Sequence, residues 1–306
     1  MRLNDLILLI VIFVSAGLAI FLPDLCAPFR PYPLYFMMFL MFLSFSRINF
    51  DSLLDTSSTA LKRLVVLVSF KLILLPAILY WITNWLFPDF AIPVLLLSGI
   101  STGVVAPFMA NLLETEVAPV LRMVIVTSLI APFSLPALLK ILAGAEVHIP
   151  LDSMVRLLAM VVFVPMLGVI LARRFCMDFL DRILVFHFPV SLIIFAAINL
   201  GVFSKYSHFF FQSPSVILSC VIVAYGLSAI YYLVGFVLTN KGGQKERLAS
   251  GISFAIMNNV LVIVFSSYFF GPLSPTLAAV YMFPFFTMII PIKILFSRST
   301  CASDKI

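Results

Sequence analysis

Long apolar runs recur along the chain, and short polar or proline-containing connections separate them. A helix needs about 20 mostly apolar residues to span a lipid bilayer. Ten runs approach this length, at 5–22, 33–46, 64–87, 91–113, 118–142, 153–172, 183–204, 214–239, 248–270 and 276–296. The pattern predicts an all-α integral membrane protein with ten transmembrane helices, five on each side of a connection near His148.

Composition agrees with this pattern and excludes a water-soluble domain. Hydrophobic residues make up 63% of the chain and charged residues 10%, with a mean hydropathy of +1.20. A soluble domain carries about a quarter charged residues, which keep its surface wetted. The four cysteines have no paired spacing such as CxxC, so buried thiols are expected, and we predict no metal site and no cofactor.

The basic residues predict the orientation of the chain, because cytoplasmic loops are enriched in Lys and Arg. With the N-terminus inside, 13 basic residues fall in inner segments: Arg2, Arg47, Lys62, Arg63, Arg173, Arg174, Arg182, Lys241, Lys245, Arg247, Lys293, Arg298 and Lys305. Four fall in outer segments: Arg30, Lys140, Arg156 and Lys205. Both termini are therefore expected to be cytoplasmic, in a bacterial inner membrane or an equivalent membrane. Topology accounts for the net charge of +6, so no nucleic-acid partner is expected.

A repeated tetrapeptide indicates that the two halves are related. Ser-Gly-Ile-Ser occurs at 98–101 and again at 250–253, an offset of 152, and the same offset maps Pro132 onto Pro284. Because five spans is an odd number, two consecutive five-span halves must have opposite orientations in the membrane. This is the inverted repeat of many secondary transporters. We expect the first repeat at 1–147 and the second at 148–306.

The fourth and ninth runs carry polar and helix-breaking residues at corresponding places. Ser101, Thr102 and Pro107 interrupt the fourth, and the adjacent Asn258 and Asn259 interrupt the ninth. Proline removes a helical hydrogen bond, and amides at bilayer depth are costly unless they are paired. The alternative for the fourth run is a continuous kinked helix packed through small residues. Two interruptions at matching positions favour two broken helices that cross at a midplane site.

Lys71 lies inside the third run, well away from either expected surface. An ammonium at the bilayer centre costs on the order of 3 kcal/mol on insertion scales. Its side chain could extend toward the surface near Arg63, although eight residues separate the two. The depth favours a functional role for Lys71.

Several segments resemble the bile acid:sodium symporter family, within the bile/arsenite/riboflavin transporter superfamily. They are "FKLILLPAILYW", "STGVVAPFMANLLETEVAPVLRMVIVTSLIAPFSLP" and "IMNNVLV", in an order and spacing similar to the family's. The resemblance implies a core domain of spans 3–5 and 8–10, in which spans 4 and 9 cross, and a panel domain of spans 1–2 and 6–7. It also implies that organic anions bind between core and panel, and that sodium is held behind the crossover in relatives that use it.

The departures from the family pattern concern its sodium ligands. A family glutamine falls on Lys71, and the glutamate shared by both sodium sites falls on Phe254 or, with a shift of one residue, Ser253. Family ligands in the fourth span fall on Ala106 and Pro107. The hydroxyls of the fifth span fall near Val120 and Val124, with Thr127 and Ser128 following. Only the amides Asn258 and Asn259 remain, so an ammonium stands where sodium would bind.

The sequence thus predicts a secondary transporter of a small organic anion that works by alternating access and is not coupled to sodium. Lys71 either titrates, which would couple transport to protons, or stays charged, which would make the protein a uniporter or exchanger. Residues expected at the substrate are Ser101, Thr102, Pro107, Asn111, Asn258 and Asn259, and those expected at the former ion site are Lys71, Thr127, Ser128, Ser253 and Phe254. The alternative is a transport-inactive sensor or scaffold with the same fold. No enzyme is expected, since no nucleophile–base constellation or phosphate-binding loop is present.

Overall fold

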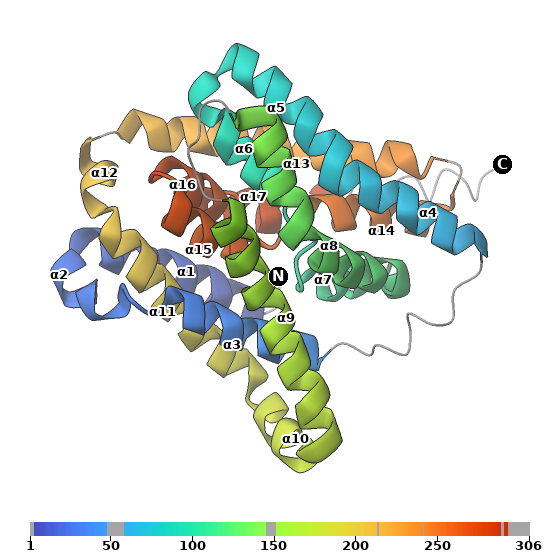
Figure 1. Ribbon diagram of the computed structural model, residues 1–306, viewed down its shortest axis with the longest axis horizontal. Helices are drawn as coiled ribbons and strands as arrows, with labels where there is room; N and C mark the ends of the chain where they lie inside the picture. Colours follow the sequence, from blue (N-terminus) through green and yellow to red (C-terminus); the bar gives the residue numbers. More distant parts are fainter. Residues whose placement is uncertain are drawn as a thin grey trace.

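The computed structural model describes residues 3–47, 58–144, 151–212, 214–240, 242–288 and 291–292. These residues are almost entirely helical (Figure 1). The α-helices are α1 (Leu3–Phe21), α2 (Pro23–Cys26), α3 (Pro33–Ser46), α4 (Ser58–Ser69), α5 (Leu75–Leu86), α6 (Ala91–Ser98), α7 (Ala106–Leu112), α8 (Val117–Ala143), α9 (Leu151–Phe175), α10 (Met177–Val185), α11 (His187–Lys205), α12 (Ser207–Gln212), α13 (Pro214–Leu238), α14 (Gln244–Ala255), α15 (Asn259–Phe269), α16 (Leu273–Val280) and α17 (Met282–Thr287). Shorter turns are η1 (Ala27–Phe29), η3 (Phe70–Leu74, a π-helix) and η4 (Pro88–Phe90).

Five helical segments among the described residues are long and apolar enough to cross a membrane. They are Ser58–Leu86, which joins α4, η3 and α5, and Val117–Ala143, Leu151–Phe175, His187–Lys205 and Ser215–Leu238. Large apolar side chains such as Trp85, Ile141 and Leu218 lie on the outer surface, 83%, 76% and 63% exposed. Such a surface requires lipid around it. The chain is an all-helical, multi-pass integral membrane protein.

The fourth and ninth predicted spans are interrupted, as the sequence predicts. In the fourth, α6 ends at Ser98 and α7 begins at Ala106, so the break contains Ser101 and Thr102 and ends just before Pro107. Pro107 lies in the first turn of α7, where a missing N–H costs nothing. In the ninth, α14 ends at Ala255 and α15 begins at Asn259. The tenth predicted span is also divided, between α16 and α17, although its sequence predicts a continuous helix.

Two glycines allow α13 and α14 to approach closely. A Cβ at Gly235 would lie 2.6 Å from the Cα of Gly251, and one at Gly251 would lie 2.4 Å from the Phe236 ring. Helices in lipid associate through packing of small residues of this kind. The contact fixes α14, and with it the break at Ile256, against a full-length span.

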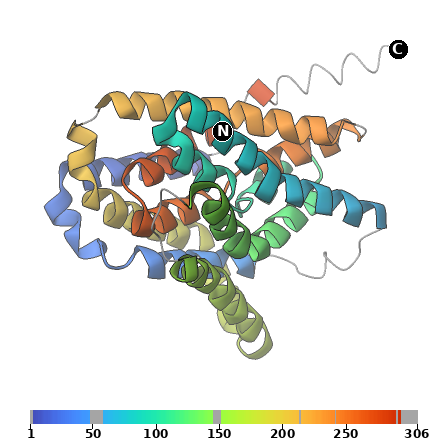
Figure 2. The same cartoon turned by 45° about the horizontal axis from the view of Figure 1, so that its top comes forward.

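Four helices pack side by side in series: α1 packs against α11, α11 against α3, and α3 against α9. Figures 1 and 2 show the blue α1 and α3 beside the yellow α11 in both views. Asn199 on α11 donates a hydrogen bond of 3.0 Å to the Ser15 hydroxyl on α1. Segments far apart in sequence thus form one group. The expected boundary between the two repeats, at 147 and 148, lies outside the described residues.

Candidate functional site

The two interruptions meet and pair with each other. Thr102 and Met257 form an isolated antiparallel bridge. The Gly103 amide donates to the Ile256 carbonyl at 2.8 Å, and the Asn258 amide donates to the Ser101 carbonyl at 3.1 Å. A broken helix in lipid leaves backbone groups that only protein or water can satisfy. Each interruption therefore satisfies part of the other, and we call residues 99–105 and 256–258 the crossover.

Only glycine fits at one position of the crossover. A Cβ at Gly103 would lie 2.5 Å from the Met257 carbonyl oxygen and 2.9 Å from the Met257 carbonyl carbon. Real Cβ atoms do not approach backbone this closely, so a larger residue would push the two segments apart.

The carbonyls at the end of α14 are satisfied by donors from several parts of the chain. Thr102 Oγ1 donates to the Ser253 carbonyl at 2.8 Å, and the Tyr281 hydroxyl donates to the Ala255 carbonyl at 2.8 Å. The Phe254 carbonyl between them accepts from Lys71 Nζ at 3.0 Å. Since the last four carbonyls of a helix have no partner within the helix, these donors stabilise its end.

Lys71 is fully buried, with 0% of its surface exposed. Its Nζ also lies 3.2 Å from Met257 Sδ and 5.6 Å from the centroid of the Phe254 ring. The residue belongs to the π turn η3, on which Ile73 and Leu74 are exposed while Lys71 points inward. The side chain does not reach the surface near Arg63, so that alternative is wrong.

The electrostatic surroundings of Lys71 are those of a cation held by a helix end. The C-terminus of a helix carries a partial negative charge, and cations near it are stabilised. Among the described residues, the ion pairs are Arg63–Glu246 and Arg156–Asp152, and Lys71 takes part in neither. Carbonyl and thioether groups, an aromatic ring and the dipole of α14 therefore surround the ammonium.

The structure brings four of the five expected ion-site residues, Lys71, Thr127, Ser253 and Phe254, together at the crossover. Thr127 Oγ1 accepts a hydrogen bond of 3.0 Å from the Thr102 amide. Ser253 and Phe254 contribute their carbonyls, and the Phe254 ring is 0% exposed. The Ser128 hydroxyl is buried without a hydrogen-bond partner.

The expected substrate residues divide into two sets. Asn258 Oδ1 accepts from the Leu261 amide at 3.4 Å and so caps α15, while its Nδ2 lies 3.9 Å from Met41 Sδ on α3. Asn259 is 3% exposed, yet neither atom of its side-chain amide has a hydrogen-bond partner. Ser101 is buried with its hydroxyl unpaired.

Pro107 and Asn111 form the other set, on α7. Pro107 is half-buried and Asn111 is exposed. The Asn111 carbonyl accepts from the Glu114 amide, which closes the turn after α7. These two residues lie outside the hydrogen-bond network of the crossover.

Sequence reasoning missed Tyr281 and Met257. Tyr281 is 0% exposed and its hydroxyl holds the end of α14 from the junction of α16 and α17. A tyrosine in an apolar run gives no signal of such a role, although most buried hydroxyls have a hydrogen-bond partner. Met257 supplies a soft acceptor to Lys71, which its type alone would not indicate.

The crossover holds the Lys71 side chain among buried backbone and side-chain polar groups. Within the described residues no cluster of three His, Cys, Asp or Glu side chains could hold a metal ion. The buried polar groups of the crossover are carbonyls, hydroxyls and amides, together with the Lys71 ammonium.

Comparison with known proteins agrees with these features. The profile of the Sodium Bile acid symporter family matches residues 31–213, which is more than half of the chain. The match includes Lys71 and the first interruption, and it ends before the second. No curated protein matches the chain significantly. The chain belongs to the sodium bile acid symporter family, a family of membrane transporters.

Proposed function

We propose that the protein is a secondary transporter of a small organic anion, that it works by alternating access, and that it does so without sodium. The observation that carries the proposal is the position of Lys71. Its ammonium lies at the crossover, 3.0 Å from the Phe254 carbonyl, in a family whose name includes sodium as the coupling ion. The protein thus carries a tethered cation at the place expected for the ion.

The proposed architecture has ten spans in two inverted repeats, 1–147 and 148–306. The order of the helices supports this architecture. The fourth and ninth spans are each interrupted near a copy of Ser-Gly-Ile-Ser, and the two interruptions pair in an antiparallel manner. The group α1, α3, α9 and α11 corresponds to spans 1, 2, 6 and 7 and would form the panel domain. Spans 3–5 and 8–10 would form the core.

The size of the electrostatic repulsion between Lys71 and a sodium ion supports the loss of sodium coupling. A positive charge about 4 Å from a bound Na⁺ costs roughly 4 kcal/mol at an effective dielectric constant near 20. This weakens binding by nearly a thousandfold. The apolar Phe254 ring stands where a carboxylate would be needed to offset the repulsion. We therefore expect the site around Lys71 to bind Na⁺ only weakly.

The proposed substrate contacts are Asn258 and Asn259. Asn258 approaches α3 of the proposed panel through Met41, and so lies where core and panel meet. An unpaired buried amide costs about 1–3 kcal/mol, which a bound solute or water would recover. Asn259 lies in the first turn of α15, whose partial positive charge favours an anion.

Uptake into proteoliposomes tests the proposal. A panel of radiolabelled organic anions, a conjugated bile acid among them, is offered with an outside buffer of sodium or of choline, over a range of pH. We expect at least one anion to enter at the same rate in both buffers. If Lys71 titrates during the cycle, the rate depends on pH, and the Lys71→Gln variant loses this dependence. Strict dependence on sodium would refute the proposal, and specific binding without any uptake would favour a sensor or scaffold.

A further inference from the structure

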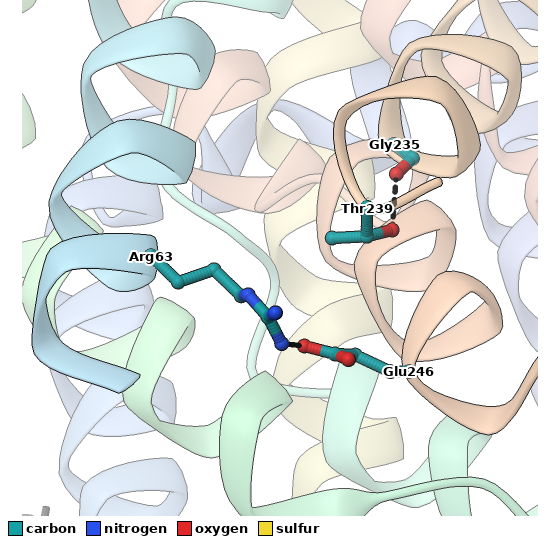
Figure 3. A network of polar contacts seen from close by, with 4 residues as sticks. All are labelled: Arg63, Gly235, Thr239 and Glu246. Carbon is teal, nitrogen blue, oxygen red and sulfur yellow. Dashed lines mark hydrogen bonds and ion pairs between the residues drawn. The ribbon is translucent and has the colours of Figure 1, made fainter. Parts of the chain in front are cut away.

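An open cavity with a volume of about 240 Å³ lies between α4, α8, the end of α13 and α14, on the side where α4 carries Lys62 and α14 carries Lys245. Figure 3 shows two of its lining residues, Arg63 on α4 and Glu246 on α14, which face each other as an ion pair. Thr239, which directly follows α13, also lines the cavity and donates to the Gly235 carbonyl at 2.9 Å. By the distribution of basic residues, this side faces the cytoplasm.

The inner end of the cavity points toward the crossover along two helices. Leu67 lines the cavity, and Lys71 follows it four residues later on the same face of the span. Met123 on α8 also lines it, and Thr127 follows by the same spacing. Thr127 is bonded to the Thr102 amide, so the cavity ends about one helical turn from the crossover on both helices.

The third helix, α14, gives the same result. Ser250 and Ser253 line the cavity, and Phe254, whose carbonyl binds Lys71 Nζ, comes next along the chain. Ser250 is only 4% exposed, and its buried hydroxyl has no hydrogen-bond partner. A polar atom in this state points to water or another small ligand in the cavity.

The charged side chains that line the cavity have no net charge. In the described part of the chain, the titratable and charged groups that face it are Arg63 from α4, Glu116 and Arg122 from the start of α8, and Glu246 from α14. Two are basic and two are acidic. At the inner end, Tyr281 faces the crossover from the junction of α16 and α17. An open cavity whose lining has no net charge and mixes polar with apolar side chains suits water better than an anion or a metal ion.

We propose that this cavity is a water-filled vestibule that connects Lys71 to the cytoplasm and carries its protons. One N–H bond of the Lys71 ammonium breaks, and the proton passes to a vestibule water and then to the cytoplasm. The reverse step restores the ammonium, and the neutral amine still has hydrogen to donate to the Phe254 carbonyl. The inference rests on the proposed function, because it gives the tethered cation a route to change its charge apart from the substrate cleft.

Thiol accessibility tests the vestibule without any need for transport. The four cysteines (Cys26, Cys176, Cys220 and Cys301) are first replaced by alanine or serine. Ser250→Cys is then compared with Ala249→Cys, a neighbour that is 1% exposed and does not line the cavity. Oriented vesicles receive a membrane-impermeant cationic methanethiosulfonate on one side at a time. Because thiol modification follows exposure, we expect Ser250→Cys to react at least about tenfold faster than Ala249→Cys, and only from the cytoplasmic side.

A second variant tests the connection to Lys71. Lys71→Cys, or Ser253→Cys if the former does not fold, is modified from the cytoplasmic side with and without Leu67→Trp. We expect the added indole to fill the inner end and slow this reaction by about tenfold, while Ser250→Cys reacts as before. The vestibule is overturned if Ser250→Cys reacts no faster than Ala249→Cys, if it reacts from the opposite side, or if Leu67→Trp changes nothing. Positive labelling in a protein that shows no uptake would leave the vestibule intact and count against the transport proposal alone.

Discussion

Gly103→Ala is the substitution that most directly tests the geometry of the crossover. The new methyl group would lie 2.5 Å from the Met257 carbonyl oxygen, so the two segments must separate by several tenths of an ångström or more. Overpacking of this kind costs about 1–3 kcal/mol. Separation also weakens two backbone hydrogen bonds, Gly103 to Ile256 at 2.8 Å and Asn258 to Ser101 at 3.1 Å. Each contributes about 0.5–1.5 kcal/mol.

These contributions sum to a loss of roughly 2–6 kcal/mol in the free energy of unfolding. At about 2 °C per kcal/mol for a chain of this size, the melting temperature should fall by about 4–12 °C. The assay is thermal unfolding of the purified protein in detergent, followed by size-exclusion chromatography. Uptake should fall with it, because the displaced segments hold Asn258.

Gly226→Ala is the matched control. Gly226 lies within α13, and a Cβ there would meet nothing within 4 Å. Because alanine favours a helix over glycine by up to about 1 kcal/mol, this variant should be as stable as the native protein or slightly more stable. If Gly103→Ala melts at the same temperature as Gly226→Ala, the two interruptions do not pair as described.

Three further substitutions have expected outcomes. Tyr281→Phe leaves the Ala255 carbonyl without its donor, so the free energy of unfolding should fall by about 1–3 kcal/mol in thermal unfolding. Asn259→Leu should abolish uptake of any transported anion and leave the melting temperature unchanged or higher, because no hydrogen bond is lost. Gly235→Ala brings a methyl group to 2.6 Å from the Gly251 Cα, and overpacking of α13 on α14 should cost about 1–3 kcal/mol.

Each of these has a control in the same chain. Tyr268→Phe alters a hydroxyl on a side chain that is 46% exposed, and should melt like the native protein. Asn84→Leu changes an amide on α5, away from the crossover, and should keep uptake. Gly17→Ala adds a methyl group with nothing within 4 Å. A native melting temperature for Tyr281→Phe, native uptake by Asn259→Leu, or equal stability of Gly235→Ala and Gly17→Ala would each contradict the corresponding contact.

The sequence predicted the positions of the interruptions because the residues that cause them act locally. Proline removes a hydrogen bond inside a helix but fits its first turn, where Pro107 lies on α7, and Asn258 favours the cap position that it occupies on α15. The depth of Lys71 was equally visible, since an ammonium in an apolar run stands out. These features depend on residue type and spacing alone.

The partners of Lys71 could not be predicted, for a physical reason. Its main acceptor is the Phe254 carbonyl, a backbone group that every residue has, 183 residues away in the chain. Which carbonyl it meets depends on the register of the crossover, and that register is set by the Thr102–Met257 bridge and the space at Gly103. Tyr281 was missed because tyrosine in an apolar run commonly serves packing alone. Tertiary contacts determine both the acceptor that Lys71 meets and the role of the Tyr281 hydroxyl.

The central claim is that the Lys71 ammonium takes the place of sodium, and sodium binding to the purified protein tests it without knowledge of the substrate. An ion present at 100 times its dissociation constant stabilises the folded protein by about 2.7 kcal/mol. For this chain that corresponds to a rise of about 5 °C in melting temperature. Lys71→Gln combined with Phe254→Glu removes the ammonium and supplies a carboxylate, so this double variant is the positive control.

The measurement is the melting temperature in sodium chloride and in choline chloride at equal ionic strength. We expect the native protein to melt at the same temperature in both salts, and the double variant to melt at a higher temperature in sodium. A sodium-specific rise of about 5 °C in the native protein would contradict the claim, because a tethered ammonium and a bound sodium ion cannot occupy the same site.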